Sequence, residues 1–166
     1  MSSIVEWFGL NNEQGIAATA QADEILVTAG AGSGKTRTLV ARYVWLLDSG
    51  LSMRQIAAIT FTEKAAREMR NRVRSAISDL ALASEDPEER QRWIALEAGI
   101  DAARIGTIHS LCAEILRAHP AEAGVDPLFD VIEEGQAAAA RARAIEGRAG
   151  GIPSSRLLRP PSVPRS

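Results

Sequence analysis

The segment 29-AGAGSGKT-36 constrains the fold of this chain more than any other. Its three glycines alternate with small residues, and a Lys-Thr pair follows at the start of a predicted helix over 36–48. The short apolar run 24-EILVTA-29 before it is typical of a buried parallel strand. A strand, a glycine-rich loop and a helix in this order place backbone N–H groups around an anion at the positive end of the helix dipole. The segment therefore predicts a phosphate-binding loop.

Several residues of this loop have a distinct chemical role. Lys35 would neutralise the β- and γ-phosphates of a nucleotide, and the Thr36 hydroxyl would ligate Mg²⁺. Ala29 stands where such loops usually begin with Gly, which predicts that this position needs no positive φ. Among 19 basic residues only Lys35 and Lys64 are lysines, which favours a need for a compact ammonium at both positions. The predicted nucleotide-binding residues are Ala29, Gly30, Ala31, Gly32, Ser33, Gly34, Lys35 and Thr36.

The rest of the chain alternates predicted helices and strands. Asn11 and Gln14 have the spacing of a capping box at the start of a helix. Further predicted elements are a strand over 55–61, a helix over 63–80 with an apolar stripe, a helix over 86–98 with Asp86 as N-cap, a strand over 104–108 and a helix over 110–118. This alternation predicts an α/β fold with a parallel sheet, because crossover helices connect parallel strands.

Composition and charge limit the classes of function. The net charge is −2, so a contact with DNA would have to come from a local basic patch. The single cysteine, Cys112, lies in an apolar stretch and is expected to be buried. The N-terminal segment lacks the pattern of a signal peptide, and no apolar run reaches the roughly 20 residues that span a bilayer. We therefore expect a cytoplasmic protein without membrane contact.

The character of the sequence changes after residue 137. Residues 141–166 contain six arginines and one acidic residue, Glu146, and most of the prolines lie between Pro153 and Pro164. Such a segment cannot bury enough apolar surface to form a core, so we predict a disordered tail over 138–166. A basic tail could bind nucleic acid, but a solvated chain end is the preferred interpretation.

Four ordered motifs resemble one known family. They are LNNEQ at 10–14, VTAGAGSGKTRTL at 27–39, AAITFTEKAAREMRNRV at 57–73 and IGTIHSLCAEILR at 105–117. Together they resemble the N-terminal motor domain of the UvrD/Rep/PcrA-like superfamily 1 DNA helicases. The continuation HPAEAGVDPLFDVIEEGQ most resembles helicase–nuclease subunits of the AddA/RecB type. The resemblance covers residues 8–137 and implies part of a RecA-like P-loop NTPase domain over 1–137, with ATP, Mg²⁺, single-stranded DNA and a partner helicase–nuclease subunit.

The resemblance also implies roles for individual residues. Gln14 matches the glutamine that reads adenine, although on local grounds it fits a capping box equally well. Arg37 matches the arginine near the adenine and the phosphates, and otherwise it is a solvated first-turn cation. The residues that match DNA-contacting motifs are Phe61, Thr62, Lys64, Thr107 and His109. Glu63 stands where many relatives have Asn, so one polar contact of the family to DNA is not assigned to this position.

These DNA-contacting assignments have structural alternatives. An exposed aromatic after a strand can stack on a base, whereas Phe61 in a core would only pack. Thr62 fits a helix cap and Lys64 fits a solvated surface as well as they fit phosphate contacts. His109, at a strand–helix junction, could satisfy a backbone carbonyl instead of binding DNA. Arg67, Arg70 and Arg74 share one helix edge, which we interpret as a solvated flank rather than a basic rim for DNA.

Hydrolysis of ATP on such a loop also requires an acidic pair after another strand. The pair is typically Asp-Glu, in which Asp holds Mg²⁺ and Glu activates water. The nearest match is Glu133-Glu134 in 129-FDVIEEG-135, where the apolar run is interrupted by Asp130. In the resembling family the acidic motif comes later, as does a second RecA-like domain. The change of character from residue 138 is typical of a truncation or a shifted reading frame.

The sequence leaves three functional hypotheses. The first is the ATP-binding portion of an ATP-dependent DNA helicase of repair and recombination, without DNA-stimulated ATPase of its own. The second is a binding-only or non-functional truncated fragment. The third is a small P-loop phosphotransferase, which would need an Arg-rich lid that the middle of the chain does not show.

Overall fold

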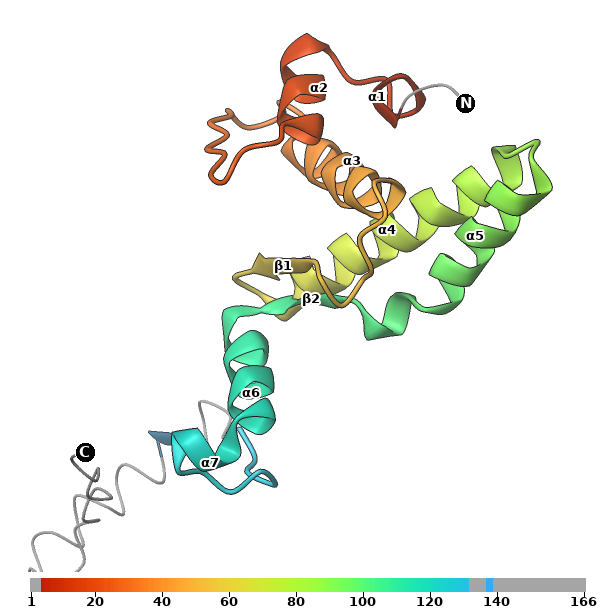
Figure 1. The fold of residues 1–166 in the computed structure, drawn as a ribbon. Helices are drawn as coiled ribbons and strands as arrows, with labels where there is room; N and C mark the ends of the chain where they lie inside the picture. The colour runs from red at the N-terminus through yellow and green to blue at the C-terminus, as the bar shows by residue number, and fades with distance from the viewer. Residues whose placement is uncertain (1–3, 132–136, 139–166) are drawn as a thin grey trace, which may run out of the picture. The chain divides into compact units, whose positions relative to one another are not determined.

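The computed structural model describes residues 4–131 and 137–138, which form helices and a short parallel sheet (Figure 1). In chain order the elements are α1 (Ile4–Trp7), α2 (Asn12–Thr19), α3 (Lys35–Asp48), β1 (Ala57–Thr60), α4 (Glu63–Ala83), α5 (Pro87–Ala98), the 3₁₀ helix η1 (Ile100–Ala102), β2 (Arg104–Thr107), α6 (Ile108–Ala118) and α7 (Pro120–Ala123). The chain is thus a mixed α/β protein, as predicted. None of the helices in these residues is both long and apolar enough to cross a membrane.

The chain divides into two compact units, Met1–His119 and Pro120–Ser166. In the second unit, α7 is followed by a turn in which Gly124 has a φ of +63° and the Val125 N–H donates to the Pro120 carbonyl at 3.1 Å. Almost all of the tail predicted over 138–166 lies outside the described residues, so its disorder and the boundary at 137 stay predictions. Glu133 and Glu134 also lie outside the described residues.

The two strands of the sheet confirm the predicted parallel pairing. β1 pairs with β2 in a register that runs from Ala57 opposite Arg104 to Thr60 opposite Thr107. The segment between them contains α4, α5 and η1, which is the long crossover that parallel strands require. β1 is only partly buried, and Ile59 is 40% exposed on its outer face. The sheet of the described residues is therefore covered incompletely.

The strand predicted over 24–29 is absent, which corrects one expectation. The sheet of the described residues contains β1 and β2, and residues 25–30 have no regular secondary structure. Leu26 is 92% and Val27 is 52% exposed. A strand exists only through hydrogen bonds to a neighbouring strand, and an apolar strand also needs cover on its faces. The composition of this segment is typical of a buried strand. Among the described residues, however, the segment pairs with no other strand.

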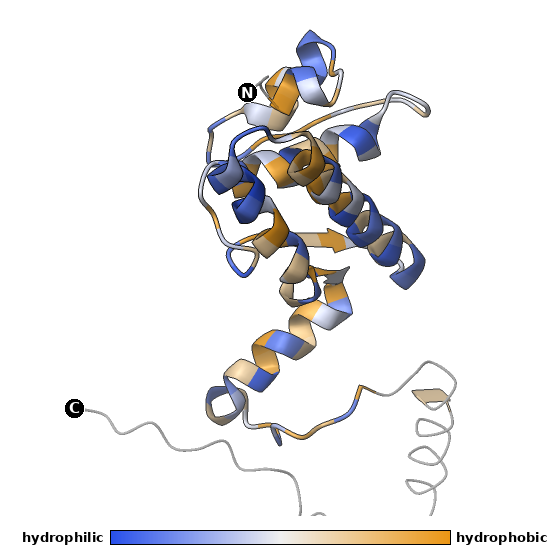
Figure 2. Ribbon diagram, turned by 90° about the vertical axis from the view of Figure 1, so that its right-hand side faces the viewer, coloured by the Kyte–Doolittle hydropathy of each residue, from blue (hydrophilic) through white to orange (hydrophobic). Residues whose placement is uncertain are grey.

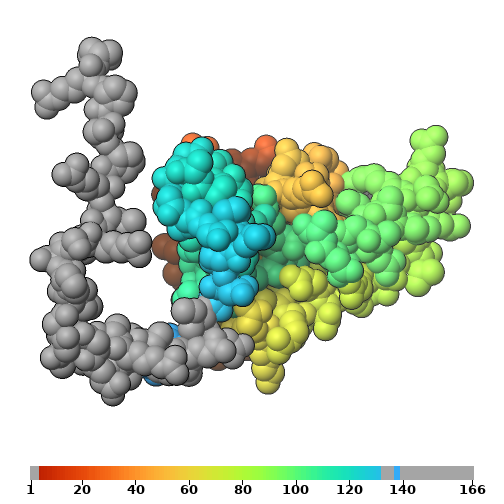
Figure 3. Space-filling view, turned by 90° about the horizontal axis from the view of Figure 1, so that it is seen from below, coloured from red at the N-terminus to blue at the C-terminus, as the bar shows by residue number. Residues whose placement is uncertain are grey.

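The core of the first unit lies between α3, α4 and α5. Its largest fully buried side chains include Leu47 of α3, Ile77 of α4 and Trp93 of α5. α4 buries the predicted stripe, since Met69, Val73, Ile77 and Leu80 are all at most 7% exposed. α4 and α5 lie side by side (Figure 3), and hydrophobic residues gather where the helices of this unit face one another (Figure 2).

Two helices bury less apolar surface than their composition suggests. On α3, Leu39 is 59% exposed on one face. Cys112 was expected to be buried, yet it is exposed on α6, whose neighbours Ile108 and Ile115 are also largely exposed. Both helices have apolar side chains that find too few neighbours in the first unit, so hydrophobicity alone overestimated their burial.

Candidate functional site

The glycine-rich loop has the backbone geometry that its glycines predict. Gly32 and Gly34 have φ values of +77° and +78°, in the left-handed region that side chains rarely adopt. A Cβ added at Gly34 would also lie 2.9 Å from Nε2 of Gln14. Ala29 has no positive φ, as the alanine at this position predicts.

The helix that follows begins without a capping side chain. Gly34 is the N-cap of α3 and makes no side-chain cap, so the first-turn N–H groups are available to another acceptor. The Lys35 ammonium bends back over the loop and donates to the carbonyl oxygens of Ala29, at 2.9 Å, and Gly30. Thr36 is exposed in the same turn. An uncapped helix start next to an ammonium is a combination that fits a phosphate group.

Gln14 forms the capping box that its spacing predicts and also contacts the glycine-rich loop. It forms the capping box of α2, in which its N–H donates to Asn11 Oδ1 at 2.8 Å and its Oε1 accepts from the Asn11 N–H at 3.1 Å. The same side chain reaches the loop, where Nε2 donates to the Ser33 carbonyl at 2.9 Å. Oε1 also accepts from the Arg37 guanidinium at 3.1 Å. The structure therefore brings Gln14, Arg37 and the loop together across 23 residues of sequence.

Gln14 and residues of the loop border one cavity of about 770 Å³. Its wall combines polar groups from α2, the loop and α3, such as Gln14 and Lys35, with apolar side chains of the preceding segment, such as Ile25 and Val27. A cavity of this size with a few convergent polar groups has the usual character of a small-molecule site. An apolar wall beside hydrogen-bonding groups suits a heterocyclic base, and the loop suits phosphates.

A second group of predicted residues lies at one edge of the sheet. Because Thr60 and Thr107 are paired in register, the residues that follow them leave the sheet at the same edge. Phe61 is 100% exposed there, so it is not a core residue. Lys64 and His109 are exposed as well, in the first turns of α4 and α6. The Thr62 hydroxyl caps α4 by accepting from the Ala65 N–H at 3.1 Å.

Thr107 differs from these residues because it is buried. It is 5% exposed, and its hydroxyl caps α6 by accepting from the Ser110 N–H at 3.3 Å. The same hydroxyl donates to Glu63 Oε1 at 3.2 Å and shares a hydrogen bond of 2.9 Å with the Ser110 hydroxyl. The side chain thus fixes the two helix starts at the edge rather than facing solvent.

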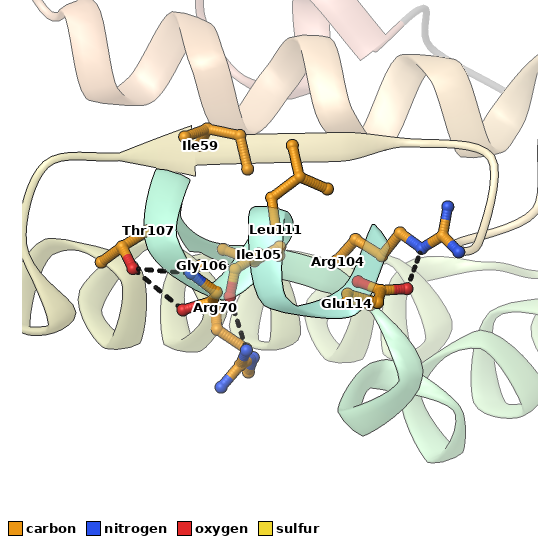
Figure 4. Close-up of a pocket in the computed structure, with 10 residues that line it drawn as sticks. Ile59, Arg70, Arg104, Ile105, Gly106, Thr107, Leu111 and Glu114 are labelled. Atoms are coloured by element: carbon orange, nitrogen blue, oxygen red, sulfur yellow. Dashed lines mark hydrogen bonds and ion pairs between the residues drawn. The ribbon is translucent and has the colours of Figure 1, made fainter. Parts of the chain in front are cut away.

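The small pocket under this edge holds further polar contacts (Figure 4). Arg70 donates to the Ile105 carbonyl at 2.5 Å, and Arg104 forms an ion pair of 2.6 Å with Glu114. Arg74 is paired with Asp101 at 2.7 Å. Arg70 and Arg74 are thus paired within the chain, which argues against a basic rim for DNA, but both are partly buried rather than fully solvated as predicted.

Two residues at these sites were missed by reasoning from the sequence. Glu63 was noted only as a departure from Asn, whereas its carboxylate accepts hydrogen bonds from two hydroxyls. Arg42 lies inside an apolar stretch of α3 and was given no role, whereas its guanidinium donates to the carbonyls of Ala18 and Ala20. A charge within an apolar helix signals a buried partner, but sequence spacing does not identify that partner.

Comparison with known proteins supports the family resemblance of the sequence motifs. The family model for the UvrD/REP helicase N-terminal domain matches residues 10–158. Similar curated proteins bear the names of ATP-dependent helicase/nuclease subunits. They include one from Ligilactobacillus salivarius, 36% identical over 110 residues, and one from Heliobacterium modesticaldum, 37% identical over 131 residues. Another, from Listeria monocytogenes, is 34% identical over 139 residues.

These alignments cover 66%, 78% and 82% of this chain, respectively. They cover 9%, 9% and 11% of the relatives, so the chain spans about a tenth of their length. The matched region contains both the glycine-rich loop and the sheet edge with Phe61 and His109. On this match, the chain belongs to the UvrD/REP helicase N-terminal domain family.

Proposed function

We propose that this chain is the ATP-binding portion of an ATP-dependent DNA helicase of repair and recombination, built as part of a RecA-like P-loop domain. The observation that carries the proposal is the uncapped start of α3, which follows two glycines of positive φ and lies beside the Gln14–Arg37 pair. The curated relatives, which are named as ATP-dependent helicase/nuclease subunits, support the same proposal. A cytoplasmic location and a partner helicase–nuclease subunit would be properties of the full-length protein.

Each group at the loop has a role in binding Mg²⁺·ATP. The first-turn N–H groups of α3 and the Lys35 ammonium would bind the β- and γ-phosphates, after Lys35 exchanges its loop carbonyls for phosphate oxygens. The Thr36 hydroxyl would ligate the Mg²⁺ that the phosphates carry. Gln14 and Arg37 would face the adenine, where an amide matches the donor and acceptor pattern of the base edge.

The edge of the sheet would hold single-stranded DNA. The fully exposed Phe61 ring offers a face on which a base can stack, and Lys64 and His109 offer groups that bind phosphates. Thr62 and Thr107 would act mainly through the helices that they cap. We expect weak binding, since this edge is small and the net charge of the chain is −2.

We further propose that the polypeptide binds ATP without appreciable turnover. Turnover requires a carboxylate that activates water, and the nearest acidic pair in the sequence, Glu133-Glu134, departs from the usual Asp-Glu. Translocation along a single strand would then be a property of the full-length protein. DNA-stimulated hydrolysis that is abolished by Glu134→Gln would overturn this part of the proposal.

The two lysines provide a matched test of nucleotide binding. Calorimetric titration with Mg²⁺·ATP should show at least about a tenfold loss of affinity in Lys35→Ala, because a charge-assisted contact to phosphate is removed. Lys64→Ala removes the other lysine of the chain and should leave ATP affinity unchanged. Equal affinity of the Lys35→Ala variant and the wild type for ATP would contradict the phosphate-loop assignment. If the chain binds ATP but does not bind DNA, the alternative function is that of a binding-only fragment.

A further inference from the structure

Arg42 connects the helix of the glycine-rich loop to the helix that carries Gln14. Its guanidinium is partly buried, and one nitrogen donates to the carbonyls of Ala18, at 3.2 Å, and Ala20, at 2.5 Å. These carbonyls lie at the C-terminal end of α2, where backbone acceptors are unsatisfied and the helix dipole favours a cation. Arg42 also lies over the ring of Trp45, 5.1 Å from its centroid, which fixes the orientation of the side chain.

The two helices are thus joined at both ends of α2. At the N-terminal end, Gln14 bonds to Arg37 and to the Ser33 carbonyl. At the C-terminal end, Arg42 holds the last carbonyls. Between these contacts, Ala18 and Ala41 are both fully buried, which lets the helices approach closely. α2 is only eight residues long, so a shift at one of its ends moves the other end as well.

We propose that Arg42 is a positioning residue for base recognition: it fixes α2 so that Gln14 faces the base of the bound nucleotide. This inference rests on the proposed function, because it assumes that the cavity takes ATP. Arg42 also borders the cavity, but we assign it no contact with the phosphates, since its guanidinium is bonded to α2. Loss of Arg42 should therefore affect recognition of the base and leave phosphate binding intact.

The test compares ATP with inorganic tripolyphosphate, which has the phosphates but no base. Titration calorimetry with Mg²⁺ should show that Arg42→Met binds ATP about tenfold more weakly, because hydrogen bonds from a charged donor are lost. Its affinity for tripolyphosphate should match that of the wild type. Arg42→Lys keeps a cation at the end of α2 and should restore part of the ATP affinity, while the exposed Arg54→Met serves as the control without effect.

A double-mutant cycle with Gln14→Ala separates positioning from other roles. If Arg42 acts through Gln14, the effect of Arg42→Met on ATP affinity should disappear in the Gln14→Ala background. An undiminished effect in that background, or an equal loss of tripolyphosphate binding, would overturn the proposal. Circular dichroism establishes that each variant is folded. A wild type that binds tripolyphosphate but does not prefer ATP overturns this inference alone, whereas a wild type that binds neither ligand overturns the proposed function as well.

Discussion

The carboxylate of Glu63 accepts a hydrogen bond from the hydroxyl of Thr107, with 3.2 Å between Oε1 and Oγ1. Thr107 is the last residue of β2 and Glu63 is the first residue of α4, so this contact joins the two helix starts at the sheet edge. Ser110 donates to the same oxygen at 3.4 Å. The contact fixes the edge but leaves a negative charge beside Lys64 and His109, where we propose that DNA phosphates bind.

Replacing this charge should strengthen DNA binding. Glu63→Gln retains an oxygen that can accept from Thr107 but removes the repulsion of phosphates, which is worth about a threefold increase in affinity at low salt. Fluorescence anisotropy with a labelled single-stranded oligonucleotide at two salt concentrations measures the effect. Glu68→Gln changes a carboxylate that is paired with Arg72 on the same helix and should have little effect. A lower affinity of Glu63→Gln would show that the carboxylate is needed for the DNA-binding geometry.

Removal of the Phe61 ring should weaken DNA binding without affecting stability. The side chain is 100% exposed, so Phe61→Ala loses no packing, but it removes a stacking face worth about 1–3 kcal/mol per base. We expect a loss of roughly tenfold in oligonucleotide affinity and an unchanged melting temperature. Leu82→Ala removes an apolar side chain that is 80% exposed on α4 and is the matched control. If both variants bind DNA like the wild type, Phe61 has no role in stacking.

Most of the features that the sequence predicted well are local. The capping box of Asn11 and Gln14 depends on residues three apart, and the structure has both of its hydrogen bonds. Asp86 and Pro87 begin α5 as predicted, and the Asp86 side chain caps the helix by accepting from the Glu88 N–H. The parallel pairing of β1 with β2 followed from the intervening helices.

The features that were missed depend on distant partners. Arg42 and Arg92 each donate to backbone carbonyls at a helix end, and sequence spacing gives no sign of these contacts. The strand expected over 24–29 failed for the related reason that its apolar pattern predicts burial without supplying a neighbour. The contact of Glu63 with Thr107 spans 44 residues and arises only from the strand register.

Tyr43 should make the fold sensitive to alkaline pH. The residue is 2% exposed in the core, and burial raises the pKa of its phenol to about 12, while the nearby Arg70 charge lowers it to a smaller extent. The unfolded phenol has a pKa of 10.0, so the unfolded state loses its proton first as the pH rises. Stability is therefore fully present below pH 10 and falls between pH 10 and 12, by roughly 1 kcal/mol per unit.

The variant Tyr43→Phe isolates this contribution. The buried Tyr43 hydroxyl finds no hydrogen-bond partner in the part of the chain that the structure describes, so its removal should cost little stability at neutral pH. Urea denaturation at about pH 8 and about pH 11 should show a smaller loss of stability in the variant than in the wild type. An identical loss in both proteins would assign the alkaline sensitivity to other groups.

The unpaired segment before the glycine-rich loop should drive self-association. Leu26 is 92% exposed next to Val27, in a stretch with strand-forming composition and no strand partner among the described residues. Such a segment can pair with its counterpart in another copy, and burial of a leucine on both sides strengthens that pairing. Sedimentation velocity over a concentration series should therefore show association of the wild type, weakened roughly tenfold in Leu26→Gln.

Leu128→Gln is the control for this effect. Leu128 is 87% exposed, so the two substitutions remove similar exposed apolar surface, but only Leu26 lies in a segment that was expected to form a strand. If nonspecific hydrophobic contacts caused the association, both variants would weaken it equally. If strand pairing causes it, Leu26→Gln should act alone, and its affinity for ATP should stay close to that of the wild type, because the phosphates are bound by the loop and α3 rather than by the Leu26 side chain.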